Sequence, residues 1–121
     1  MATTLDVLAK SKYLSLTTYR KDGSAVATPV WLVRDGDALL ITTQGSSGKV
    51  KRIRNNSQVL LAPCDARGKL KGDQVLGQAS LQDAHQTERT TELVRKRYGL
   101  LGWLLTRRGG DDRQGISVTL A

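Results

Sequence analysis

Hydroxyl side chains and a glycine stand directly before a run of lysines and arginines in TTQGSSGKVKRIRNN, residues 42–56. The pattern predicts a short helix that begins at Ser46 or Ser47 and turns Val50 and Ile53 toward the core. A helix start leaves several amide hydrogens unpaired and carries partial positive charge, so it is a natural place to bind phosphate. The chemistry indicated by this stretch is therefore anion binding.

The cations of the predicted helix divide into two pairs. Lys49 and Arg52 are three residues apart and share one face, while Lys51 and Arg54 share another that points more toward solvent. One pair could clamp a phosphate, and the other would add long-range attraction for a charged tail. A plain solvated basic helix with a serine cap is an alternative that the residues leave open.

Two other classes of anion binder fit less well. A Walker A nucleotide loop needs Gly at position 43 and Ser or Thr at position 50, but the chain has Thr43 and Val50, so we exclude an NTPase. The net charge of +8 also attracts nucleic acid. A stacking nucleic-acid binder interleaves aromatic residues with its cations, and residues 46–56 contain none. We therefore expect a small-molecule ligand and no nucleic-acid partner.

Side chains that catalyse reactions directly are scarce. His85 is the only histidine and lies in a polar stretch, which disfavours a zinc site or a Ser-His-Asp triad, so we expect no metal. Cys64 is the only cysteine, and a buried structural thiol is favoured over a nucleophile because no partner histidine is evident. If the protein is an enzyme, we expect a cofactor to perform its chemistry.

The length of 121 residues predicts one domain, residues 1–121, with a single core. One cysteine excludes an intramolecular disulfide, and the N-terminus lacks the apolar region of a signal peptide. No apolar run approaches the roughly 18 residues that a membrane span needs. We therefore expect a cytoplasmic protein without a transmembrane segment.

Turn signals separate a series of short apolar runs. Three turn signals combine Asp with Gly: residues 21–23, 35–36 and 65–68. In the first two Gly directly follows Asp, and in the third two residues separate them. Such turns favour hairpins because glycine accepts a positive φ. The sheet should therefore be mainly antiparallel. Its predicted strands cover residues 13–19, 25–33, 38–43, 58–64, 74–81 and 115–121.

Two of these strands, 25–33 and 58–64, are apolar almost throughout, which predicts that both of their faces are covered. A small barrel packed on a helix or a second subunit would cover them. Pro29 and Pro63 lie in the same two strands and cannot donate to a ladder. They indicate either a bulge at a barrel corner or one shared crevice where free N–H groups bind a planar heterocycle.

A longer helix is predicted over residues 83–105, with Asp83 and Gln86 at capping-box spacing. One face then repeats Val94, Tyr98 and Leu101.

The end of this helix, YGLLGWLLTRR at residues 98–108, has two interpretations. It packs on the barrel or a partner, or else Trp103 and its leucines form an apolar substrate wall or a patch that contacts lipid through Arg107 and Arg108. A peripheral membrane contact therefore stays open.

The order of four stretches, KYLSLTTYRKDGSAVATPVW, TTQGSSGKVKRIRNN, VLLAPCDARGKLKG and RKRYG, resembles a known family over about residues 10–120. The family is the PPOX-class F420-dependent branch of the flavin/deazaflavin oxidoreductases, whose fold is the pyridoxamine-5'-phosphate-oxidase-like split barrel. The resemblance implies a mainly β, six-stranded antiparallel split barrel with a few short helices. It also implies a homodimer with the cofactor in a groove at the subunit interface.

The resemblance further assigns residues to that groove. The flat cofactor ring would lie along Thr28, Pro29, Val30, Trp31, Pro63 and Cys64. The phosphate would be held by Thr43, Ser46, Ser47, Gly48, Lys49 and Arg52. An acidic tail would meet Lys51, Arg54 and Arg67.

The cofactor implied is coenzyme F420, with FMN as the alternative. F420 carries a polyglutamate tail beyond its phosphate, and the surplus of cations suits the longer anion. The implied activity is hydride transfer from reduced F420 to an unsaturated small molecule of unknown identity. A non-catalytic F420 carrier is the second hypothesis.

Overall fold

The computed structural model describes residues 3–107 and 112–121 and, at residues 102, 103 and 105–107, the backbone alone. One curled antiparallel sheet carries the fold, in the strand order β2-β1-β5-β6-β7-β4-β3. The strands are β1 Tyr13–Tyr19, β2 Ala25–Val30, β3 Val33–Asp35, β4 Ala38–Gln44, β5 Gln58–Cys64, β6 Val75–Leu81 and β7 Arg113–Leu120. The mainly β antiparallel class is therefore confirmed, and two predicted strands, 13–19 and 58–64, have the observed bounds.

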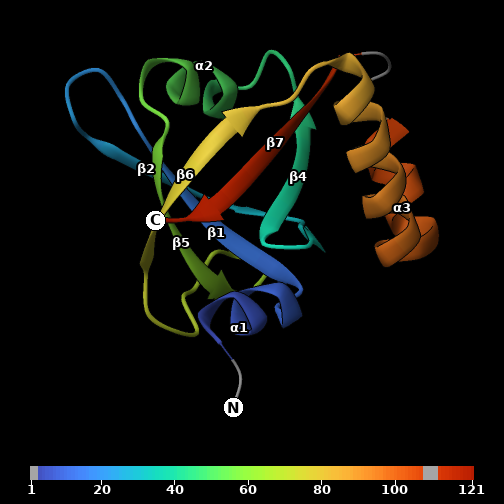
Figure 1. Ribbon diagram of the computed structural model, residues 1–121, viewed down its shortest axis with the longest axis horizontal. Helices are drawn as coiled ribbons and strands as arrows, with labels where there is room; N and C mark the ends of the chain where they lie inside the picture. The colour runs from blue at the N-terminus through green and yellow to red at the C-terminus, as the bar shows by residue number, and fades with distance from the viewer. Residues whose placement is uncertain (1–2, 108–111) are drawn as a thin grey trace.

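Three helices cover the sheet: α1 Thr4–Lys10, α2 Gly48–Asn55 and α3 Ala84–Arg107. Figure 1 shows α2 at one end of the barrel, α1 at the opposite end and α3 along one side. The sequence predicted α2 and most of α3 but missed α1. Its signal was the pair Thr3 and Asp6, which form a capping box and bury Leu8 in the core.

The predicted strand 25–33 is two strands that lie at opposite edges of the sheet. β2 pairs with β1, β3 pairs with β4, and only Trp31 and Leu32 connect them. Because two residues span so little distance, the sheet must curl until its edges meet. The six-stranded split barrel is thus formed by six chain segments, one of which crosses the gap. We call the crossing at residues 31–32 the seam.

Neither proline interrupts its strand. Pro29 pairs with Ser15 and Pro63 pairs with Leu14, each in a continuous register. The predicted bulge is therefore wrong. β2 is an edge strand, where a proline needs no partner for its missing N–H. The covered-strand prediction holds for β5, whereas β2 alternates between exposed and covered residues and is open on one face.

The core lies inside the curled sheet. Leu16, Leu39, Ile41, Leu61 and Ile116 are fully buried there. From α2, Val50 and Ile53 are buried too, as predicted from their spacing. The glycines of the three predicted turns, Gly23, Gly36 and Gly68, all have positive φ.

α3 begins at the predicted capping box, where Asp83 and Gln86 exchange hydrogen bonds between side chain and backbone. The helix breaks at Gly99, with φ 62° and ψ −141°, a conformation that favours glycine. Val94 is buried before the break, but Leu101 after it is 51% exposed, so Leu101 does not continue the buried face. The Trp103, Arg107 and Arg108 side chains lie outside the described residues. None of the described helices combines the length and the apolar composition that a membrane span needs.

Candidate functional site

A cavity of about 390 Å³ lies where the end of β2, the end of β4 and the start of α2 meet. Its lining joins segments distant in sequence: Tyr13, Pro29, Val30, Trp31, Thr42, Thr43, Gln44, Ser47, Lys49 and Arg113. The seam thus forms one wall and the cationic helix start another. The lining contains two cationic side chains and no carboxylate. An anion joined to an apolar or aromatic group matches this composition.

Ser47 is the N-cap residue of α2, as the sequence predicted for Ser46 or Ser47. Its backbone is extended, but its side chain makes no capping hydrogen bond. The Ser47 Oγ is buried and has no hydrogen-bond partner among the described residues. A buried hydroxyl without a partner costs free energy, and the first amides of α2 also lack intrahelical acceptors. A ligand oxygen in the cavity would satisfy both.

Lys49 follows two residues later and is half-buried in the same cavity. None of the described carboxylates forms an ion pair with it; the described ion pairs involve only other residues. Burial lowers the pKa of the Lys49 ammonium, and the nearby Arg52 charge lowers it further. The ammonium is therefore held in a place where an anion would relieve an electrostatic cost.

Arg52 is near Lys49 but does not line the cavity. Its Nε donates to Thr18 Oγ1 on β1 at 2.6 Å. Its guanidinium covers Gly48, where a Cβ would lie 2.6 Å from Arg52 Nη1. Any larger residue at position 48 would displace this guanidinium from the helix start. Lys51 and Arg54 are exposed, as predicted for the second pair.

Arg113, at the start of β7, lines the cavity although the sequence interpretation did not include it. Its Nε and Nη2 both donate to Thr42 Oγ1, at 3.3 and 3.1 Å. Burial lowers the pKa of the Arg113 guanidinium, as does the Arg95 charge, while Asp112 raises it. The sequence carried little signal for this residue, because only the pairing of β7 with β4 brings it here.

The last residues of α3 before its break at Gly99 hold the seam in place. The Tyr98 ring stacks on Trp31 with centroids 4.5 Å apart and planes 8° apart. The Tyr98 hydroxyl lies 2.8 Å from the Lys12 carbonyl and 3.0 Å from the Leu32 carbonyl, and it accepts from the Leu32 N–H at 3.2 Å. Arg97 donates to the same Leu32 carbonyl at 2.6 Å. Trp31 is therefore a fixed wall of the cavity.

The structure brings together only part of the predicted site. The predicted residues in the cavity lining are Pro29, Val30, Trp31, Thr43, Ser47 and Lys49. Thr28 donates to the Leu16 carbonyl at 3.4 Å within the sheet. Ser46 is exposed, and its N–H donates to Asp112 at 3.3 Å.

Pro63 and Cys64 line a different cavity, between α1 and the loop after β5. The shared crevice expected from the two prolines is therefore not formed within one chain; Tyr13 is the residue that lines both cavities. Cys64 is buried, and burial raises the pKa of its thiol. This agrees with a structural thiol, since a nucleophile needs a lowered pKa.

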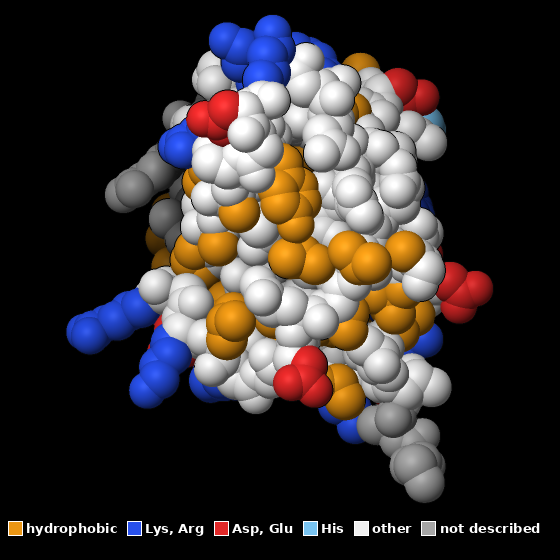
Figure 2. Space-filling model, turned by 90° about the vertical axis from the view of Figure 1, so that its left-hand side faces the viewer, with side chains coloured by type: hydrophobic (Ala, Val, Ile, Leu, Met, Phe, Trp, Pro, Cys, Tyr) orange, Lys and Arg blue, Asp and Glu red, His pale blue; other side chains and the backbone are white. Residues whose placement is uncertain are grey.

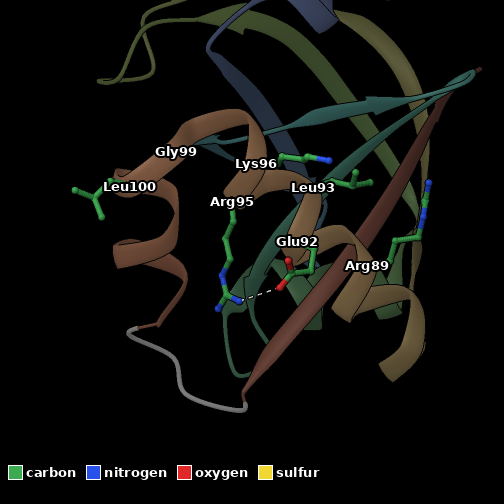
Figure 3. Close-up of a pocket in the computed structure, with 7 residues that line it drawn as sticks. All are labelled: Arg89, Glu92, Leu93, Arg95, Lys96, Gly99 and Leu100. Carbon is green, nitrogen blue, oxygen red and sulfur yellow. Dashed lines mark hydrogen bonds and ion pairs between the residues drawn. The ribbon is translucent and has the colours of Figure 1, made fainter.

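A larger groove of about 700 Å³ follows α3, as Figure 3 shows. All of its lining residues come from that one helix, and Arg95 pairs with Glu92 at 3.3 Å. Among the described residues, it contains neither a predicted site residue nor an unpartnered buried polar atom. His85 is exposed, and no cluster of metal-ligating side chains exists in the described part of the chain. The cavity beside Ser47 is therefore the better candidate.

Comparison with known proteins identifies the family of this chain. A sequence profile of the pyridoxamine 5'-phosphate oxidase family matches residues 2–121. The chain belongs to this family. The fold expected from the resemblance, the split barrel of the pyridoxamine 5'-phosphate oxidase family, is thereby confirmed. A search of curated protein sequences found no match.

Solved structures of similar fold carry different functional names. An F420 reductase is 22% identical with a TM-score of 0.71, covering 100% of this chain and 96% of that one. The conserved hypothetical protein Rv2991 from Mycobacterium tuberculosis is 18% identical with a TM-score of 0.75, covering 99% and 81%. The heme storage protein HutZ from Vibrio cholerae is 14% identical with a TM-score of 0.70, covering 93% and 83%. At these identities the similarity shows the fold alone.

Proposed function

We propose that the cavity holds the phosphate of a flavin-type redox cofactor and that the protein is an F420-dependent reductase. The observation that carries the proposal is the buried, unpartnered Ser47 hydroxyl beside the half-buried Lys49 at a helix start. Donors of this kind suit a phosphate. The Trp31 wall beside them suits a flat ring.

The choice of F420 over FMN rests on charges outside the cavity. FMN ends at its phosphate, whereas F420 continues into an acidic tail. Lys51 and Arg54 are exposed on α2, next to the helix start, and Arg67 is exposed on the loop after β5. Together with the net charge of +8 they favour the longer anion. FMN is the alternative.

Bound F420 would supply hydride to an unsaturated small molecule. The protein's own residues would bind and orient the cofactor and exclude water from the cavity. Ser47, Lys49 and the first amides of α2 would fix the phosphate end, and Trp31, held by Tyr98, would fix the ring. A haem function is less well supported, because His85, the only histidine, is exposed on α3 and outside the cavity lining.

One titration tests the cofactor. The protein is purified from a host without F420 and titrated with F420, FMN and a short DNA duplex at low and high salt. We expect F420 to bind more tightly than FMN, and DNA to bind at low salt only. A yellow preparation that retains FMN would overturn the choice of cofactor. To distinguish a reductase from a carrier, the protein and reduced F420 are mixed with quinones and enones. If F420 is not oxidised faster than without the protein, the carrier hypothesis is favoured.

We further propose that the protein is a homodimer and that a second copy borders the cavity. The outer face of the sheet has an uncharged row, Ala27, Thr17, Leu60 and Leu76, paired across β2, β1, β5 and β6. Leu76 is 49% exposed. Figure 2 views the β2 and β5 side, where hydrophobic side chains gather and charges lie toward the margins. Pro29 adjoins this row and also lines the cavity.

An aspartate at position 27 tests the dimer. Ala27→Asp would place a charge at the β2 end of the uncharged row, and burying it in a dimer interface without a partner is costly. We expect light scattering after gel filtration to give a dimer mass for the wild type and a monomer mass for Ala27→Asp. Ala84→Asp, at the exposed start of α3, is the matched control and should remain dimeric. A monomeric wild type contradicts the proposal.

A further inference from the structure

Arg113 is fixed by a directional chain of hydrogen bonds. Thr91 Oγ1 donates its one proton to the Thr87 carbonyl at 2.9 Å. Thr42 must therefore be the donor in its 3.2 Å hydrogen bond with Thr91, and its own oxygen is left to accept. Arg113 donates to that oxygen through both Nε and Nη2. The chain runs from Arg113 through two hydroxyls to a carbonyl of α3.

This arrangement fixes the guanidinium but does not neutralise it. Threonine oxygens carry no charge, and no carboxylate lines the cavity. The described ion pairs do not include Arg113, and its Nη1 has no hydrogen-bond partner among the described residues. Against the lowering by burial, the Asp112 charge raises the pKa of Arg113, but Asp112 is exposed, accepts from the Ser46 N–H and forms no ion pair with Arg113 among the described ion pairs.

A half-buried cation of this kind is costly unless an anion joins it. The same cavity also contains Lys49, which is likewise half-buried and unpaired among the described residues. Lys49 comes from α2 and Arg113 from β7, so two segments distant in sequence each contribute a half-buried cation to one cavity. A single anionic group with more than one negative charge, such as a phosphate, removes both costs.

We propose that Arg113 is a second anion-binding residue of the cavity and that, with Lys49, it selects phosphorylated ligands over their dephosphorylated forms. The inference rests on the proposed function in using the same cavity, but it concerns a residue of β7 that the family resemblance does not assign. Because Thr42 already orients the guanidinium, little side-chain freedom is lost when the anion binds.

The test compares FMN with riboflavin, which differ in the phosphate alone. Binding is measured by calorimetry for the wild type, Arg113→Gln, Arg113→Lys and Lys10→Gln. Lys10, exposed at the end of α1, lies at the opposite end of the barrel from α2 and controls for loss of one charge. We expect Arg113→Gln to lose about tenfold or more in affinity for FMN and F420 and to bind riboflavin unchanged. Lys10→Gln should match the wild type.

Two results would overturn the inference. One is an Arg113→Gln variant that keeps the wild-type preference for FMN over riboflavin. The other is an Arg113→Lys variant that folds normally, by circular dichroism, yet binds FMN no better than Arg113→Gln. The lysine variant also covers the case in which the glutamine variant fails to fold.

Pyrophosphate separates this inference from the proposed function. Thermal denaturation is followed with and without pyrophosphate in a buffer free of other polyvalent anions. If neither cofactor binds the wild type but pyrophosphate stabilises the wild type and not Arg113→Gln, the cofactor proposal fails and Arg113 stands as an anion-binding residue. If pyrophosphate stabilises both proteins equally, or neither, the role of Arg113 is refuted.

Discussion

Replacing Lys49 with glutamine is expected to weaken the binding of FMN and F420 by about 10- to 100-fold, the loss of one charge-assisted phosphate contact in a partly buried site. The folded state should lose little stability, because the Lys49 ammonium has no ion-pair partner among the described residues and burial already disfavours its charge. Calorimetric titration gives the affinity, and urea unfolding gives the stability. Lys10→Gln again serves as the charge control.

The lowered pKa of Lys49 also predicts how the stability of the wild-type protein changes with pH. Burial lowers the pKa of Lys49 from its ordinary value of 10.5, so the unfolded chain binds more protons than the folded one as pH approaches that value. The free energy of unfolding of the ligand-free protein should therefore gain from Lys49 as pH rises through this alkaline window. Phosphate binding should weaken in the same window, because the ammonium is lost. Neither effect should occur in Lys49→Gln, and a cofactor affinity equal to that of the wild type would refute the phosphate assignment.

Replacing Tyr98 with alanine is expected to lower the free energy of unfolding by about 2–4 kcal/mol, somewhat less than a fully buried aromatic residue costs. The variant loses the stack on Trp31 and leaves the Lys12 and Leu32 backbone groups without the hydroxyl. Tyr98→Phe keeps the stack and should lose about 1–3 kcal/mol from the unmade hydrogen bonds. Urea unfolding followed by circular dichroism measures both.

The two Tyr98 variants also test whether the stack of Tyr98 on Trp31 contributes to cofactor binding. Tyr98→Ala frees Trp31 and should weaken cofactor binding, whereas Tyr98→Phe should bind nearly as the wild type does. Equal cofactor affinity in the alanine variant and the wild type would show that Tyr98 stabilises the fold without positioning the wall. An alanine variant as stable as the wild type would contradict the role of Tyr98 at the seam.

Local sequence patterns predicted the parts of the fold that local forces determine. The apolar strands 13–19 and 58–64 end at turns whose glycines, Gly23 and Gly68, adopt the positive φ that the sequence indicated. The start of α2 and its buried residues followed from spacing alone. The same local logic placed Ser47 and Lys49 at one helix start, and the structure gives both a place in one cavity.

Features determined by distant contacts could not be predicted in this way. The strand break at residues 31–32 depends on Tyr98 and Arg97, which reach Leu32 across 66 and 65 positions. Nothing in the apolar run 25–33 indicates it. Arg113 joins Lys49 because β7 pairs with β4, a register that the sequence of neither strand specifies alone. The separation of Pro63 from Pro29 has the same origin. Pro29 pairs with Ser15 and Pro63 with Leu14, and consecutive residues of a strand face opposite sides of the sheet.

The short crossing at Trp31 and Leu32 also restricts how the chain length can change over evolution. One inserted residue there would shift β3 by one position and exchange the inward and outward sides of every residue that follows up to the next turn. Two inserted residues would carry the tryptophan away from its stack on α3. We therefore expect insertions and deletions to be tolerated in the turns between paired strands, such as residues 20–24, where an added residue leaves both faces of the neighbouring strands as they were.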